Sequence, residues 1–136
     1  MMGRLVFKSW ISAADLAERP DAIFVFGDNM IRQGFGGQAA VMRGKPNALG
    51  IPTKWSPSNA PGAFFRDADL PAVKSAIDEG FARIEEALRS GLEVIWPRDG
   101  IGTGLAGLPK HAPVIHEYIL GRLSALLEIA DVTTEN

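Results

Sequence analysis

Two segments of the chain share one outline, in which a short apolar run is followed by a glycine-rich stretch and then by a helical pattern. The first apolar run, Ala22–Phe26, precedes the cluster Gly34-Phe35-Gly36-Gly37 and a short Ala-rich helical segment, Gln38–Arg43. The second, Val94–Trp96, continues into the stretch PRDGIGTGLAGLP. Apolar runs of this length, bounded by turn residues, predict buried strands. Of the 15 glycines, more than half lie in the two stretches: Gly27, Gly34, Gly36, Gly37, Gly100, Gly102, Gly104 and Gly107.

A glycine loop between a strand and a helix is an arrangement that suits an anion. Glycines allow the backbone to come close to a ligand, and free N–H groups at the start of a helix attract negative charge. In sheets of parallel strands, ligands bind beyond the carboxyl ends of the strands, so the two loops are expected at the same edge. Either cluster taken alone is also explained by a tight turn. Two clusters at equivalent strand ends predict one ligand held between them.

Helical and strand patterns alternate along the rest of the chain, which predicts a single α/β layered domain over residues 1–136 with a largely parallel or mixed sheet. Pro52 favours an edge position for the strand that contains it. Residues 130–136 form either a short strand or a frayed end, and the sequence does not decide between the two. The other expected elements are strands over Arg4–Trp10, Ala48–Lys54 and Leu92–Trp96, and helices that begin at the capping box Ser12–Asp15, run from Asp69 to Gly91, and cover His111–Leu127.

Composition excludes several classes of function. The chain has no cysteine, so disulfides, a cysteine-ligated metal and a cysteine nucleophile are excluded. With only two histidines a zinc site would need carboxylate ligands, and no metal or cofactor is expected. A net charge of -2 argues against a broad basic surface for nucleic acid. No apolar run is long enough to span a membrane, and no signal-peptide pattern is present. We therefore expect a cytoplasmic protein without a membrane partner, and the oligomeric state stays open.

The segment from Trp55 to Arg66 predicts a loop rich in aromatic residues, WSPSNAPGAFFR. Large aromatic side chains on a surface loop have two explanations. They fold back onto the core, or they shape a ligand pocket. The sequence does not decide between these.

Three segments together resemble the macro domain. The pattern Asn29-x-x-x-x-Gly34-Phe35-Gly36-Gly37 is similar to the macro-domain pattern in which an Asn after a core strand precedes a glycine loop and a short helix. Trp96–Pro109 resembles the second, phosphate-gripping loop. Ile51-Pro52-Thr53-Lys54 resembles the strand end that carries the catalytic Lys in one branch, the terminal ADP-ribose glycohydrolases and the DNA ADP-ribosylglycohydrolase antitoxins. The resemblance covers about residues 22–127 and implies a three-layer α/β/α fold with a mixed sheet flanked by helices.

What the resemblance implies is an ADP-ribose site whose partner is ADP-ribose or ADP-ribosylated DNA, RNA or protein. Lys54 and Asn29 would be the catalytic residues, with Asn29 on the ribose hydroxyls beside the scissile bond. The ligand-binding residues would be Gly34, Phe35, Gly36, Gly37 and Gln38 on the distal ribose and a phosphate, and Gly100, Ile101, Gly102, Thr103, Gly104 and Leu105 on the diphosphate.

The most specific chemical expectation is that Lys54 acts as a nucleophile. Desolvation at the mouth of an apolar pocket lowers the pKa of a lysine, so that neutral amine is present near neutral pH. Such an amine can attack the ribose C1″ carbon, and water can release ADP-ribose afterwards. A surface lysine at a strand end is the alternative. Ala106 stands where the glycohydrolase pattern has Asp, and Asp99 would replace that Asp only if the second loop folds back.

Four residues near these motifs receive structural interpretations. Phe35 either packs against the distal ribose or fills the core. Asp28 is interpreted as a turn residue whose side chain bonds the nearby backbone. His111 and His116 are expected to be solvated surface residues without a role.

Three functions remain from the sequence. The first is an ADP-ribosylglycohydrolase acting through Lys54 and Asn29. The second is a non-catalytic module that binds ADP-ribose or a related nucleotide, which Ala106 favours. The third is an unrelated α/β protein whose glycine loops bind another phosphorylated metabolite.

Overall fold

The structure is a computed structural model that describes residues 1–136. Its five strands are β1 (Arg4–Lys8), β2 (Ile23–Asn29), β3 (Ala48–Lys54), β4 (Val94–Pro97) and β5 (Asp131–Glu135). Its α-helices are α1 (Ala13–Glu18), α2 (Ala39–Met42), α3 (Leu70–Arg89), α4 (Leu108–His111) and α5 (Pro113–Ile129). Two short 3-10 helices, η1 (Pro61–Ala63) and η2 (Asp67–Asp69), lie between β3 and α3.

The strands form one sheet in the order β3-β2-β4-β1-β5, and every pair of neighbours is parallel. The expectation of a mixed sheet is therefore wrong. Each strand is joined to the next strand in the sequence by a segment that contains a helix. Such a crossover returns the chain to the edge from which it left, so all strands point the same way. β3 is an edge strand, as Pro52 predicts.

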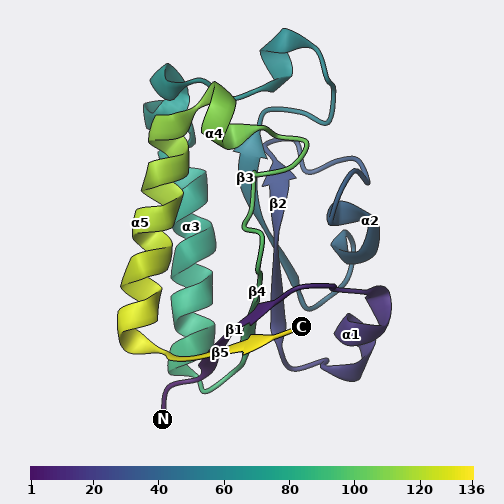
Figure 1. The fold of residues 1–136 in the computed structure, drawn as a ribbon, viewed down its shortest axis with the longest axis vertical. Coiled ribbons are helices and arrows are strands. Elements are labelled where there is room, and N and C mark those ends of the chain that lie inside the picture. Colours follow the sequence, from purple (N-terminus) through teal and green to yellow (C-terminus); the bar gives the residue numbers. More distant parts are fainter.

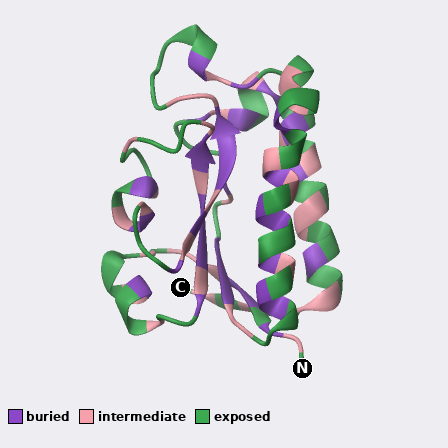
Figure 2. Cartoon of the chain, turned by 180° about the vertical axis from the view of Figure 1, so that it is seen from behind, coloured by how far each residue is buried: buried purple, intermediate pink, exposed green.

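Helices cover both faces of the sheet, with α3 and α5 on one side and α1 and α2 on the other (Figure 1). Side chains alternate between the two faces along each strand. Val25 lies in the larger apolar cluster beneath α3 and α5, and its neighbours Phe24 and Phe26 lie in the smaller cluster beneath α1 and α2. Both faces of the central strands are consequently buried, and the strands are coloured as buried over most of their length in Figure 2.

The apolar stripe predicted for the long helix forms the face of α3 that packs on the sheet. Val73, Ile77 and Phe81 are each at most 1% exposed. A Cβ at Gly80 would lie 2.9 Å from the Ile51 side chain, so this glycine lets α3 approach β3 closely. Ile84 and Leu88 continue the same buried stripe.

The element boundaries differ from expectation at two informative places. β2 extends to Asn29, so Asp28 is a strand residue and not a turn residue. The predicted last helix is divided at Ala112, whose φ of −146° separates α4 from α5. The capping box at Ser12 and Asp15 is confirmed. The chain after residue 130 forms β5, which pairs with β1.

No helix of the structure combines the length and the apolar character needed to cross a membrane.

Candidate functional site

A cavity of about 250 Å³ lies at the carboxyl edge of the sheet, between two loops. We call residues 33–38 the first glycine loop and residues 98–107 the second glycine loop. The first follows β2 and the second follows β4, and these strands are neighbours in the sheet. The carboxyl end of β3 adds Thr53 and Lys54 to the wall. The arrangement agrees with the sequence expectation that the loops meet at one edge.

Most of the residues proposed for the site line this cavity. They are Asn29, Gly34, Gly36, Gly37, Gln38, Lys54, Gly100, Gly102, Thr103, Gly104 and Leu105. Ile101 is not among them, because its side chain is 3% exposed and belongs to the larger apolar cluster. Phe35 is also absent from the lining and is 68% exposed, so the expectation that it fills the core is wrong.

The peptide N–H groups of the two loops are unusual because the protein offers most of them no acceptor. In the first loop this holds for each N–H from Gly34 to Gln38, and in the second loop for each from Ile101 to Ala106. Consecutive free N–H groups in glycine-rich turns form concave sites for anions. Gly34, Gly100 and Gly102 have positive φ values of 92°, 91° and 74°, which bend the loops and favour glycine there.

The helix that follows the first loop contributes less to anion binding than the sequence predicts. α2 has a single turn, and the N–H groups of Ala39, Ala40 and Val41 already donate to the carbonyls of Gly36, Gly37 and Gln38. A helix this short has little dipole, and its first N–H groups are already used within the turn. The anion-binding capacity therefore resides in the loop peptides before α2.

Close backbone approaches hold the two loops against the sheet and against each other. A Cβ at Gly27 in β2 would lie 3.1 Å from the backbone nitrogen of Gly102. A Cβ at Gly36 would lie 3.1 Å from Cδ1 of Leu105, so the tips of the two loops are in contact. A Cβ at Gly34 would lie 2.8 Å from Pro57, which brings the segment after β3 against the first loop.

Lys54 lies at the end of β3 with only 7% of its surface exposed. Its Nζ donates to the carbonyl of Ser58 at 2.9 Å and lies 4.6 Å from the centroid of the Phe64 ring. Burial lowers the pKa of Lys54 because it disfavours the charged form of the amine. No carboxylate is paired with this amine, and the surface-lysine interpretation is wrong.

Asn29 is 6% exposed, and its side chain is engaged with the first loop. Nδ2 donates to the carbonyl of Gln33 at 2.7 Å, and Oδ1 accepts from the N–H of Gln33 at 3.4 Å. One Nδ2 hydrogen and one lone pair of Oδ1 remain for a ligand. Asn29 therefore shapes the loop in addition to lining the cavity.

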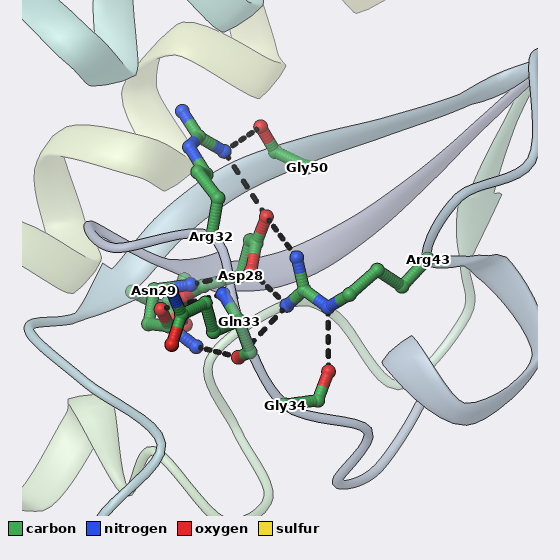
Figure 3. Close-up of polar contacts among 8 residues, drawn as sticks. Asp28, Asn29, Arg32, Gln33, Gly34, Arg43 and Gly50 are labelled. Atoms are coloured by element: carbon green, nitrogen blue, oxygen red, sulfur yellow. Dashed lines mark hydrogen bonds and ion pairs between the residues drawn. The ribbon is translucent and has the colours of Figure 1, made fainter.

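Sequence reasoning missed a buried ion cluster centred on Asp28 (Figure 3), of which Asp28 and Arg43 line the cavity. The Asp28 carboxylate pairs with the guanidinium of Arg43 and accepts from Arg32 Nη1 at 3.3 Å. Its side chain is 4% exposed. The signal in the sequence was an acidic residue directly behind a buried apolar run, because a carboxylate that becomes buried there requires a cationic partner. The expected bond to nearby backbone is present, because Asp28 Oδ1 accepts from the N–H of Asn29 at 2.8 Å. The expectation of a turn residue is wrong, because Asp28 lies in β2 and also pairs with two arginines.

None of the aromatic residues in the loop after β3 lines the cavity, and two of them pack on the core. Phe65 is fully buried, and Trp55 packs edge-on against it with ring centroids 5.2 Å apart. Phe64 instead lies between Lys54 and His111, with its ring centroid 4.4 Å from that of the imidazole. Burial lowers the pKa of His111, and the charges of Arg66, Lys110 and Lys54 add to this effect. His111 is therefore partly buried within a cationic cluster and is not a freely solvated residue.

The second loop brings Asp99 to the cavity, and Ala106 lines the same wall. Thr103 Oγ1 donates to the Asp99 carbonyl at 2.8 Å, which folds this part of the loop back on itself. The Asp99 carboxylate has no hydrogen-bond partner within the protein and remains available to a ligand. Whether Asp99 takes the place of the Asp expected at position 106 stays a prediction.

No group of three or more histidine or acidic side chains lies close enough together to hold a metal ion. The cavity is lined by the desolvated Lys54, the amide residue Asn29, two carboxylate residues and two rows of peptide N–H groups. This set of groups can bind an anion and supply a nucleophile.

Comparison with curated proteins and with solved structures returned no match. Residues 6–122 match a family described as a family of unknown function, DUF7831. The matched region contains both glycine loops, Lys54 and the Asp28 cluster. The chain therefore belongs to the DUF7831 family.

Proposed function

We propose that this protein is an ADP-ribosylglycohydrolase of the macro-domain type, which removes ADP-ribose from nucleic acid or protein. One observation carries the proposal. Lys54, whose amine is desolvated, lines the same cavity as the two loops whose peptide N–H groups lack acceptors. A nucleophile beside an anion site is what cleavage of a phosphorylated sugar requires.

The two loops supply the binding part of the site. Peptide N–H groups carry no net charge to desolvate and are fixed in the backbone, so they suit a diphosphate. The cavity of about 250 Å³ is smaller than the pockets of roughly 300 to 1,000 Å³ that enclose whole drug-sized ligands. The diphosphate and the distal ribose occupy it, and the adenine lies outside. Phe35, exposed at the tip of the first loop, packs against the ligand from there.

The chemical step begins with neutral Lys54. Its lone pair forms a bond to the ribose C1″ carbon while the bond from C1″ to the carrier breaks, and the carrier leaves with that electron pair and takes up a proton. Water then adds to C1″, the bond to Nζ breaks, and ADP-ribose is released with the lysine restored. Asn29 holds the ribose hydroxyls during both steps, and Asp99 removes a proton from the water in the second step.

The second candidate is a module that binds ADP-ribose without cleaving it. Two observations favour it. Ala106 presents no carboxylate to the cavity, and the Asn29 side chain is already bonded to the backbone of Gln33. A binding module would still use both glycine loops and would leave Lys54 as a contact to the ligand.

Turnover distinguishes these candidates. We expect the wild-type protein to release ADP-ribose from ADP-ribosylated DNA or ADP-ribosylated protein, and Lys54→Ala to be inactive while still folded. Lys45→Ala is the matched control, because Lys45 is exposed and lies outside the cavity. Equal activity of Lys54→Ala and wild type would remove Lys54 as the nucleophile.

Calorimetry with free ADP-ribose tests the site itself. Binding by wild type without turnover of any carrier would establish the binding module. An absence of heat at millimolar ADP-ribose would remove both macro-type functions and leave another phosphorylated metabolite as the ligand of the two loops.

A further inference from the structure

The guanidinium of Arg43 lies between a buried carboxylate and the first glycine loop (Figure 3). Its Nη2 donates to Asp28 Oδ1, and its Nη1 lies 3.4 Å from Asp28 Oδ2. The side chain of Arg43 is 15% exposed and that of Asp28 is 4% exposed, so the pair is shielded from water. Arg43 directly follows the last residue of α2, whereas Asp28 lies in β2. The ion pair therefore joins the strand before the first glycine loop to the end of the helix after it.

The same guanidinium also holds two carbonyls of the loop. Nε of Arg43 donates to the carbonyl of Gly34 at 2.5 Å, and Nη2 donates to the carbonyl of Gln33 at 3.2 Å. A trans peptide is planar, and its C=O and N–H bonds point in opposite directions. Fixing the carbonyls of Gln33 and Gly34 therefore fixes the N–H groups of Gly34 and Phe35, and neither N–H has an acceptor in the protein.

The number of donors in this arrangement explains why the residue is an arginine. A guanidinium carries about five N–H donors in a rigid fork, and Arg43 uses all but one of them on Asp28, Gln33 and Gly34. A lysine has a single nitrogen and cannot span a carboxylate and two carbonyls in this way. Most of the hydrogen-bonding capacity of Arg43 is thus directed at the loop and not at the cavity.

We propose that Arg43, anchored by Asp28, is a positioning residue that holds the first glycine loop in the conformation that receives the phosphate groups of the ligand. The inference rests on the proposed function for the identity of that ligand. Arg43 acts through the peptides of Gln33 and Gly34, whose carbonyls it holds. Asn29 assists it, because Nδ2 of Asn29 binds the same Gln33 carbonyl at 2.7 Å.

The experiment compares wild type with Arg43→Met, Arg43→Lys and the exposed control Lys45→Met. Affinity for ADP-ribose is measured by calorimetry, and the order of residues 33–38 is measured in the ligand-free proteins by ¹⁵N relaxation. We expect both Arg43 variants to bind ADP-ribose roughly 10- to 100-fold more weakly. We also expect increased motion confined to residues 33–38, and wild-type behaviour in Lys45→Met.

Arg43→Lys is included because its ammonium group keeps a cation beside Asp28, so that this variant should fold even if Arg43→Met does not. Addition of methylguanidinium to a folded Arg43→Ala protein should restore part of the affinity, which a general loss of stability would not allow. Wild-type loop order and wild-type affinity in Arg43→Lys and Arg43→Met would overturn the inference. If wild type itself binds no ADP-ribose, the proposed function fails, and the loop order of the ligand-free variants still decides the role of Arg43.

Discussion

The Nζ atom of Lys54 lies 4.6 Å from the centroid of the Phe64 ring, in a position where the ring face attracts a cation. Burial acts in the opposite direction and lowers the pKa of Lys54. The ring therefore moderates the effect of burial on this amine. The fraction of Lys54 that is neutral depends on both groups.

Removal of the Phe64 ring should change the pH dependence of turnover. Neutral Lys54 is the attacking form, so the rate rises with pH along the acidic limb of the profile. In Phe64→Leu the amine stays desolvated but loses an attraction of about 0.5 to 2 kcal/mol for its charged form. Its pKa falls further, and the acidic limb should move to lower pH by roughly 0.4 to 1.5 units. A pH profile of kcat measures this, with Phe7→Leu as the control, and an unmoved limb would contradict it.

Lys54→Met should be more stable than wild type. The folded state binds the proton of Lys54 less tightly than the unfolded chain does, so protonation of this lysine favours unfolding. Met keeps the apolar stem and removes the charge, which should add about 0.5 to 2 kcal/mol to the free energy of unfolding near neutral pH. The gain should shrink as the pH rises toward the ordinary lysine value of about 10.4. Denaturant unfolding at several pH values checks this, and a less stable variant would argue against a desolvated ammonium.

Gly50→Ala should disturb the Asp28 cluster without removing any of its charges. A Cβ at Gly50 would lie 2.5 Å from Asp28 Oδ2, so the carboxylate must move away from its arginines. A displaced buried carboxylate and a crowded strand should together cost about 1 to 3 kcal/mol of stability. Gly62→Ala is the matched control, since a Cβ there meets nothing within 4 Å. Thermal unfolding of both variants measures the difference, and similar stabilities would show that Asp28 has room to shift.

Gly102→Ala should damage the second loop, whereas Gly104→Ala should not. Gly102 has a φ of +74°, and a Cβ there would lie 2.9 Å from the Leu108 side chain. Gly104 has open space around its Cβ position. A non-glycine residue in the left-handed region costs on the order of 1 to 2 kcal/mol before any clash is counted. Unfolding by denaturant, followed by ADP-ribose calorimetry on the folded variants, separates the two positions. Equal stability of the two variants would contradict the expectation.

His111 should make the stability of the protein depend on pH in the mildly acidic range. Because its pKa is lowered in the folded state, the unfolded chain binds the proton more tightly. Stability should therefore fall as the pH drops below about 6.5, the ordinary histidine value, toward the lowered pKa. The melting temperature of His111→Gln should decline less than that of wild type between pH 7 and pH 5. His116→Gln is the control, and an identical slope in His111→Gln would exclude this residue as the source.

Local patterns in the sequence were enough to predict most of the helices and strands. The apolar stripe of α3, the capping box at Ser12 and the apolar runs that became β2 and β4 depend on neighbours in the sequence, and all three are confirmed. The direction of β5 was not accessible in this way, because it depends on how α5 returns the chain to β1. The separate helix α4 was missed because its four residues make a single turn, which is too short for a helical apolar repeat.

The parts of the candidate site that consist of glycine-rich backbone could be predicted, because glycines mark such loops in the sequence. The parts that depend on contacts between residues distant in the sequence could not. The two glycine loops and Lys54 do line one cavity. The role of Arg43 was invisible, because its partners Asp28 and Gly34 lie 15 and 9 residues away in the sequence. The environment of His111 was missed for the same reason, since Phe64 reaches it from the loop after β3. The assignment to the macro domain stays a prediction.

The position of β1 in the sheet has a consequence for the speed of folding. Leu5 is paired with Val94 on one side and with Val132 on the other, so both neighbours of this strand come from distant parts of the chain. The entropy of closing such long loops must be lost before the pairing stabilises anything, and proteins rich in distant contacts fold slowly. The β2–β3 pair, which is joined by a short segment, can form much earlier. The cavity wall made by these two strands should accordingly be assembled before the far edge of the sheet closes.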